Sequence, residues 1–208
     1  MERPPILYVS PYQELPAHKW ASKTVELIQA HPLQPTEIVE VALQAWSSIF
    51  ESSIGGLHIG TDLFPTPQIM GDFLHALIPH EFSRRYPGKW RKEQEASEKD
   101  LVCIHRPEYS TEIKTSSHPR NIYGNRSYAQ PDQGTGKKGK SGYYIAVNFA
   151  KFQDARAKPK IVRIRCGWLD HIDWIPQKSA TGQQASLSAD SRASKLIELY
   201  PNKSQLLK

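Results

Sequence analysis

The amino-acid sequence predicts an α/β (α+β) fold in which helices flank a central mixed β-sheet. Helical periodicity dominates the N-terminal third, strand-like runs fill the middle, and a last short helix is expected around residues 192–200. Helices on either side of a strand cluster are typical of one sheet with helices packed against it. A chain of 208 residues is long enough to bury a substantial core as one domain.

Three N-terminal segments, residues 16–31, 35–52 and 67–82, carry apolar side chains at helical spacing. Asp72 and His75 fall on the opposite, polar face of the third segment. The apolar stripes of the second and third segments predict these core positions: Ile38, Val41, Ala42, Ala45, Trp46, Ile49, Ile69, Met70, Phe73, Leu74, Leu77 and Ile78.

Four strands are expected in the middle of the chain, at residues 100–105, 110–116, 142–149 and 160–168. The second of them alternates strictly between polar and apolar side chains. Residues 131–142 between the strands are rich in Gly and Lys and contain no apolar anchor, so this segment is expected to be a mobile loop.

Composition and cysteine usage exclude several classes of protein. Hydrophobic residues make up 38% of the chain, and no apolar run reaches the roughly 20 residues of a membrane span. The N-terminus does not resemble a signal peptide, and Cys103 and Cys166 lie in apolar strand-like runs, which predicts a cytoplasmic protein with reduced thiols. The histidines and cysteines do not form a zinc motif, and the Gly/Lys loop lacks Walker spacing, so no nucleotide cofactor is expected.

Positive charge is concentrated in the middle of the chain. Residues 114–165 contain 12 Lys and Arg residues against the acids Asp132 and Asp154, a local charge of +10 in a chain of net charge +6. A basic segment on an otherwise acidic body suits a polyanionic partner such as DNA. The alternative is a solvated basic surface with no partner.

Glu112 and Lys114 are two residues apart in the alternating segment 110–116, so their side chains share one face of the strand. A hairpin turn near Arg106 would bring Asp100 opposite Glu112. Two neighbouring carboxylates favour a hard divalent cation between them, and Mg²⁺ typically binds one or two carboxylates together with phosphate oxygens. We therefore expect Asp100 and Glu112 as metal ligands and Asp100, Glu112 and Lys114 as the catalytic group. An exposed Glu–Lys ion pair is the alternative interpretation.

The spacing of Asp100, Glu112 and Lys114 resembles the signature of the PD-(D/E)xK nuclease superfamily. The strings "EIKTSS", "YGNRSYAQ" (123–130) and "GWLDHIDWIPQKSATGQQASL" (167–187) are similar to type II restriction endonucleases of the ScaI type. The resemblance covers roughly residues 67–190. It implies a restriction-endonuclease-like sheet, Mg²⁺-dependent cleavage of double-stranded DNA at a short palindrome, with Mn²⁺ as a substitute, and a homodimer.

Two details of the superfamily pattern bear on this chain. Lys99 stands where the pattern has proline before the aspartate, and that proline is often absent in the superfamily. Many members also carry an acidic residue on an upstream helix, for which Asp72 is the first candidate and Glu51 the second. Either is as readily an ordinary surface carboxylate, so neither joins the predicted ligand set.

The segment after the catalytic strand has the side chains needed to contact DNA. Amides and the guanidinium can pair with base edges, whereas hydroxyls and lysines suit phosphate oxygens. The predicted DNA-binding residues are Asn125, Arg126, Ser127, Tyr128, Gln130, Lys137, Lys138 and Lys140. The alternative is a polar helix start capped by Asn125 or Ser127. The groove-reading candidates Gln177, Gln183 and Gln184 and the strand arginines Arg163 and Arg165 are left open between DNA contacts and structural roles.

The chain is expected to be a single nuclease domain in three parts. Residues 1–66 form an N-terminal helical part, residues 67–170 the catalytic core, and residues 171–208 a C-terminal segment for DNA contact and dimerisation. The expected function is that of a type II restriction endonuclease. Two alternatives remain: a structure-specific repair or recombination nuclease of the same superfamily, and a non-catalytic basic DNA-binding module.

Overall fold

The computed structural model describes residues 9–130, 139–152, 158–179 and 181–201. Its α-helices are α1 (Trp20–Ala30), α2 (Pro35–Phe50), α3 (Pro67–Arg85) and α4 (Ala189–Ser194). Short 3-10 helices are η1 (Ala17–Lys19), η2 (Pro107–Tyr109), η3 (Arg126–Ala129) and η4 (His171–Asp173). Within these ranges, the expected α/β architecture with a central mixed sheet is confirmed.

The central sheet has the strand order β11-β8-β7-β5-β4-β3. Only β5 and β7 pair in parallel, and the other neighbours are antiparallel. Its strands are β3 (Trp90–Lys92), β4 (Leu101–Cys103), β5 (Thr111–Ser116), β7 (Gly142–Phe149), β8 (Ile161–Leu169) and β11 (Leu196–Tyr200). Every residue of β7 is buried, as expected for a strand covered on both faces of its sheet.

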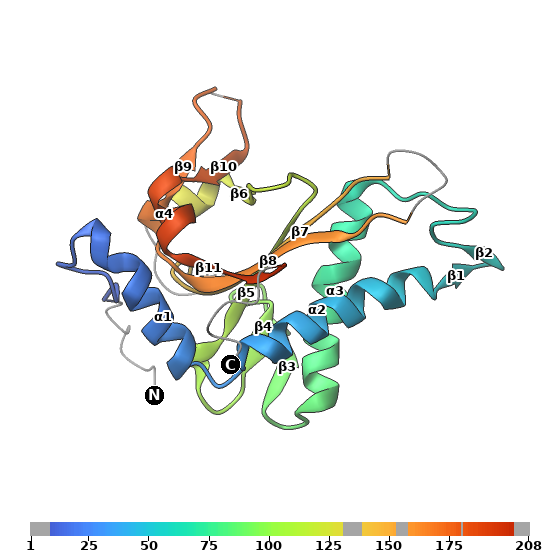
Figure 1. Ribbon diagram of the computed structural model, residues 1–208, viewed down its shortest axis with the longest axis horizontal. Helices are drawn as coiled ribbons and strands as arrows, with labels where there is room; N and C mark the ends of the chain where they lie inside the picture. The colour runs from blue at the N-terminus through green and yellow to red at the C-terminus, as the bar shows by residue number, and fades with distance from the viewer. Residues whose placement is uncertain (1–8, 131–138, 153–157, 180, 202–208) are drawn as a thin grey trace.

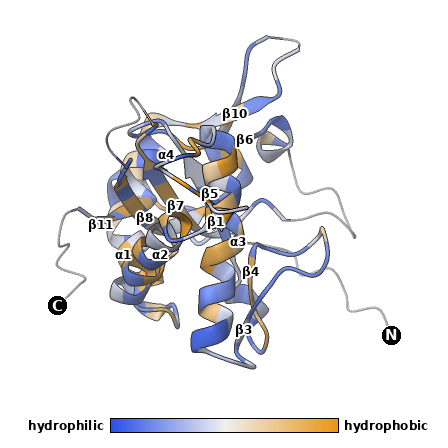
Figure 2. Ribbon diagram, turned by 90° about the vertical axis from the view of Figure 1, so that its right-hand side faces the viewer, coloured by the Kyte–Doolittle hydropathy of each residue, from blue (hydrophilic) through white to orange (hydrophobic). Residues whose placement is uncertain are grey.

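A smaller sheet of order β6-β10-β9 packs against the central one. Its strands are β6 (Tyr123–Asn125), β9 (Trp174–Pro176) and β10 (Gln184–Leu187), and a separate hairpin is formed by β1 (Ser53–Ile54) and β2 (Leu57–His58). Figures 1 and 2 show α1, α2 and α3 on one side of the central sheet and the smaller sheet with α4 on the other. The central sheet is therefore the middle layer of the molecule.

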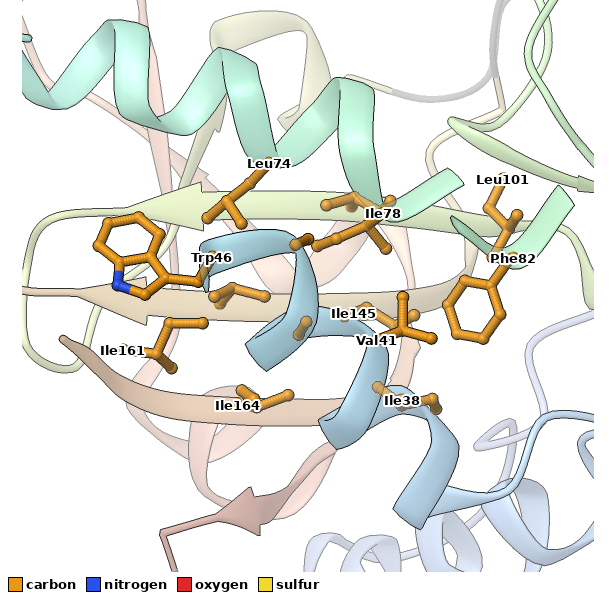
Figure 3. Packing of buried hydrophobic residues seen from close by; sticks show 14 of the residues in the cluster. Ile38, Val41, Trp46, Leu74, Ile78, Phe82, Leu101, Ile145, Ile161 and Ile164 are labelled. Carbon is orange, nitrogen blue, oxygen red and sulfur yellow. The ribbon is translucent and has the colours of Figure 1, made fainter. Parts of the chain in front are cut away.

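Two hydrophobic clusters fill the two sides of the central sheet. The larger packs α2 and α3 against Ile113, Ile145 and Ile164, which share one face of the strands. Figure 3 shows Ile145 and Ile164 in this layer. The smaller lies between the two sheets and includes Tyr144 and Ala146 from the opposite face of β7. Because side chains alternate along a strand, each strand contributes to both clusters.

The helices begin where the sequence places capping residues and prolines. Pro35 starts α2 after a capping box between Gln34 and Glu37. Pro67 starts α3, where the Thr66 hydroxyl accepts a hydrogen bond from the Ile69 amide. The stripe of α2 is buried as predicted, whereas Ile69 of α3 is 44% exposed, so its assignment to the core was wrong. It lies in the first turn of α3, beside the buried stripe that contains Met70, Gly71 and Leu74.

The expected helix around residues 192–200 is largely wrong. The helix α4 ends at Ser194, and Leu196–Tyr200 form the edge strand β11, which pairs antiparallel with β8. Leu196 and Leu199 are buried in the two different clusters. The open edge of β8 therefore supplies backbone hydrogen bonds that override the local helical pattern.

Two expectations about the chemistry of the chain can be checked in the described residues. Cys103 and Cys166 are buried free thiols. In the part of the chain that the structure describes, no helix has the length and apolar character required to cross a bilayer.

Candidate active site

A cleft of about 890 Å³ opens beside the C-terminal half of β5. One wall is the polar side of α3, the second is the loop of residues 117–119, and the third is formed by β6 and η3. Its lining side chains are mostly polar and include Asp72, His75, Lys114, Asn125 and Lys151. The cleft thus collects side chains from both layers that cover the central sheet.

The close approach of α3 to β5 depends on Gly71. A Cβ atom at this position would lie 2.7 Å from the Thr115 hydroxyl oxygen on β5, closer than packed atoms tolerate. The glycine therefore lets the helix backbone rest on β5, and this contact brings Asp72 and His75 to the rim of the cleft.

Glu112 and Lys114 lie side by side on β5, as predicted from their spacing. The Lys114 ammonium donates a hydrogen bond of 2.8 Å to Oε1 of Glu112. The Glu112 side chain is 1% exposed and that of Lys114 is 13% exposed. The alternative of an exposed surface ion pair is therefore wrong, because the carboxylate is buried and the Lys114 side chain lines the cleft.

Asp100 lies next to this pair, immediately before β4. Leu101 pairs with Thr111, the register that brings Asp100 opposite Glu112. Oδ2 of Asp100 accepts a hydrogen bond of 2.7 Å from the Ile113 amide and lies 3.7 Å from Nδ1 of His75. The backbone of β5 and the helix α3 thus hold the carboxylate from two sides.

Tyr128 of η3 completes the surroundings of Glu112. Its hydroxyl donates a hydrogen bond to Oε1 of Glu112, and the ammonium of Lys114 lies 4.5 Å from its ring centroid. Burial and the negative charge of Glu112 raise the pKa of Tyr128, so its hydroxyl stays protonated and remains a donor. The ring rests against Gly124, where a Cβ atom would lie 2.8 Å from it.

The donor chemistry of this group suits a hard divalent cation. Asp100 and Glu112 offer carboxylate oxygens, the ligands that Mg²⁺ prefers. Among the described residues, no three His, Cys, Asp or Glu side chains gather closely enough to hold an ion alone. An ion held by two carboxylates fits Mg²⁺, which keeps water or phosphate oxygens in its other positions.

Comparison with known proteins identifies the family. Residues 10–200 match the family model described as ScaI restriction endonuclease. The chain belongs to the ScaI restriction endonuclease family. It is 49% identical over 193 residues to the type II restriction enzyme ScaI of Streptomyces caespitosus, an alignment covering 92% of this chain and 85% of the relative. No solved structure matches it. The resemblance to type II restriction endonucleases of the ScaI type is confirmed.

The fold places only some of the predicted DNA-binding residues at the cleft. Asn125 lines the cleft and has an exposed side chain. It occupies the position before η3 but forms no side-chain cap, contrary to the capping alternative. Gln184 of β10 also lines the cleft. Arg126 donates from Nη1 to the Ser179 carbonyl at 3.2 Å, so it also braces the β9–β10 turn.

Tyr128 also lines the cleft, although it is 6% exposed and its hydroxyl donates to Glu112. The remaining predicted positions have different surroundings. The Lys140 ammonium lies 4.5 Å from the centroid of the same tyrosine ring. Ser127 and Gln130 belong to η3 and its C-terminal cap. Lys137 and Lys138 lie outside the described residues.

The two upstream acidic candidates differ in position. Asp72 lines the cleft and accepts a hydrogen bond of 3.0 Å from Gln68 on the same helix. Glu51 follows α2 and lines a separate hollow beside Trp46 and Lys158. Of the two, only Asp72 borders the cleft that contains Lys114.

Sequence reasoning did not assign the contacts of His75 and Tyr128 to the site. The contact of His75 with Asp100 joins residues 25 positions apart and depends on how α3 packs on β5. That of Tyr128 with Glu112 depends on how the smaller sheet seats η3 over β5. The sequence contains no periodic signal for either contact.

We expect Tyr128→Phe to lower the free energy of unfolding by about 1.5–3 kcal/mol, because the buried Glu112 carboxylate loses a hydrogen-bond donor. Tyr123→Phe is the control: the Tyr123 hydroxyl lines the cleft and accepts only a 3.4 Å contact from Asn121 among the described residues. Denaturant unfolding of both variants measures the difference. Equal stability of the two variants would contradict this role of the Tyr128 hydroxyl.

Proposed function

We propose that this restriction endonuclease hydrolyses a phosphodiester bond of double-stranded DNA at the cleft above Lys114, with Mg²⁺ held by Asp100 and Glu112. The observation that carries the proposal is the packing of Glu112, Lys114 and Asp100 beside one polar cleft. Membership of the ScaI restriction endonuclease family supports this assignment.

Each residue of the group has a distinct task in the proposed reaction. Hydrolysis forms a bond between a water oxygen and phosphorus and breaks one phosphorus–oxygen ester bond. Negative charge accumulates on the phosphate oxygens in the transition state, and the ammonium of Lys114 facing the cleft stabilises that charge. Glu112 orients this ammonium through its 2.8 Å hydrogen bond, and Tyr128 orients Glu112.

The carboxylates of Asp100 and Glu112 would hold the metal. When bound there, the ion would supply Lewis-acid activation of the phosphate and of the attacking water. The Ile113 amide fixes the Asp100 carboxylate through its 2.7 Å hydrogen bond, so this ligand is oriented by the strand backbone. His75 contacts the same carboxylate oxygen from α3.

The first test is cleavage of a mixed-sequence plasmid. Mg²⁺ or Mn²⁺ should give discrete bands, because a sequence-specific enzyme cuts at a limited number of sites. Ca²⁺ should support binding with little cleavage. Cleavage that persists in excess chelator would refute the metal requirement. A smear, or a preference for branched DNA, would favour a structure-specific nuclease.

The second test replaces Lys114 by Met, which keeps the length of the side chain and removes its charge. The single-turnover cleavage rate should fall by about 10²–10³-fold, as expected when one donor that stabilises transition-state charge is lost. DNA affinity should fall only slightly, since one phosphate contact among many is lost. Circular dichroism should first establish that the variant is folded, because Glu112 is buried.

Lys151→Met is the matched control for Lys114. Lys151 lines the same cleft, but no described contact joins it to Glu112. Its loss should leave the single-turnover rate at saturating enzyme within about threefold of wild type, because uniform binding does not alter the chemical step. Similar rates for Lys114→Met and wild type would remove Lys114 from the catalytic group.

We also propose that two chains act on one palindromic site. One cleft can engage one scissile phosphate, whereas a palindrome presents two that are related by a two-fold axis. Sedimentation of the DNA complex in Ca²⁺ should give two chains per duplex. A single chain that binds the duplex and nicks only one strand would overturn this assembly.

A further inference from the structure

A second hollow, which we call the arginine hollow, lies on the central sheet near the active-site cleft. It has a volume of about 340 Å³ and receives Arg120 from the loop after β5, Arg163 and Arg165 from β8, and Arg192 from α4. Of its described lining residues, Glu198 is the one acid. Four guanidinium groups therefore face one carboxylate, which leaves three positive charges.

Arg165 is the buried centre of this hollow. Its side chain is 3% exposed, and Nη2 donates hydrogen bonds of 2.8 Å to the Arg120 carbonyl and to Oδ1 of Asn148. Both acceptors are neutral, and Nε has no partner among the described residues. Burying an arginine without a bonded carboxylate is costly, so the arrangement calls for an anion from outside.

The neighbouring arginines add positive charge around Arg165. Burial and the charges of Arg163 and Arg192 lower the pKa of Arg165 to about 10, so it still carries its charge at neutral pH. Glu198 is engaged by Arg163 at 2.7 Å. Arg192 donates to the side-chain oxygen of Asn121, which is again neutral.

The arginine hollow lies on the same face of the central sheet as the catalytic group. Lys114 pairs with Ala146, Ala146 with Arg165, and Arg165 with Glu198, so these residues form one row across four strands. Two strand spacings, roughly 10 Å, separate the backbones of Lys114 and Arg165.

One loop separates the hollow from the cleft. His118 of this loop lines the cleft, whereas Arg120, two residues later, lines the hollow. Arg165 holds the loop through the Arg120 carbonyl, and Asn148 holds it through the carbonyls of His118 and Asn121. A polyanion bound in the cleft can therefore continue over this loop towards the hollow.

We propose that the arginine hollow binds a backbone phosphate of the DNA strand that occupies the cleft. A phosphate oxygen matches the forked donors of several guanidinium groups, and a DNA strand presents further phosphates next to the scissile one. The choice of DNA as the source of the phosphate rests on the proposed function; a free phosphate ion has the same chemistry and is the competing source.

Arg120→Gln tests the proposal with little risk to the fold, because the structural contact uses the carbonyl of Arg120 and leaves its exposed side chain free to vary. Binding to a mixed-sequence duplex in chelator should weaken by about tenfold, and the slope of log affinity against log salt should fall by about 1. Lys89→Gln is the control, an exposed charge in the turn before β3 with no described ion pair. It should change neither quantity.

Glu198→Gln provides a change in the opposite direction. It removes the carboxylate that engages Arg163, so DNA affinity should increase and the salt slope should steepen. If both variants bind the duplex as wild type does, with an unchanged slope, the proposal is wrong.

Two further measurements distinguish the sources of the phosphate. Calorimetric titration with inorganic phosphate shows whether the arginine hollow binds the free ion. If Arg120→Gln lost phosphate binding but bound DNA as wild type does, DNA would not be the source of the phosphate. The second measurement uses a duplex that carries the site found by plasmid cleavage, with single phosphates replaced by neutral methylphosphonates. At one position this replacement should weaken DNA binding by the wild type about tenfold and DNA binding by Arg120→Gln only slightly.

The outcome of these binding experiments does not depend on the outcome of the cleavage tests of the proposed function. The salt dependence uses a mixed-sequence duplex without metal, so it reports on the hollow even if no cleavage occurs. Discrete cleavage together with an unchanged slope in Arg120→Gln would leave the nuclease assignment intact and refute the phosphate site.

Discussion

The rest of the site depends on the hydrogen bonds that hold the buried carboxylate of Glu112. Its side chain is 1% exposed, and its Oε1 accepts hydrogen bonds from Lys114 and Tyr128. A charge removed from water needs a counter-charge and hydrogen-bond donors to remain ionised. Strand β5 supplies the ammonium, and the smaller sheet supplies the hydroxyl through η3. The carboxylate thus links the two sheets at the base of the cleft.

The layered architecture explains how polar groups come to lie beside a well-packed core. One face of the central sheet carries Ile113, Ile145 and Ile164 against α2 and α3, as Figure 3 shows for Ile145 and Ile164. The other face carries Glu112, Lys114 and Arg165. The smaller sheet covers only part of this face. A rigid apolar layer therefore supports a polar surface, and the strand register sets the spacing of its charges.

Several features of the site could be predicted from local rules. Side chains two apart on a strand share a face, which puts Glu112 beside Lys114. The hairpin register followed from the length of the connection, and the pairing of Leu101 with Thr111 agrees with it. The buried stripe of α2 followed from its helical period. These predictions needed only neighbouring residues.

Other features required the whole fold. The local pattern of residues 196–200 favoured a helix, but the open edge of β8 made them a strand. The hydrogen bond from Tyr128 to Glu112 could not be predicted from the sequence, because it depends on how η3 packs over β5. His75 reaches Asp100 only because Gly71 lets α3 lie against β5. In each case the deciding contact joins residues distant in sequence.

The sequence by itself therefore determined the three N-terminal helices and the four middle strands, the pairing of Glu112 with Lys114 and the excess of basic residues in the middle of the chain. Tertiary structure alone decided that Glu112 is buried, that Tyr128 holds it, and that four arginines from three separate segments line one hollow. The physical reason is range: periodicity and turn length act over a few residues, whereas burial and charge compensation depend on which distant segments pack together.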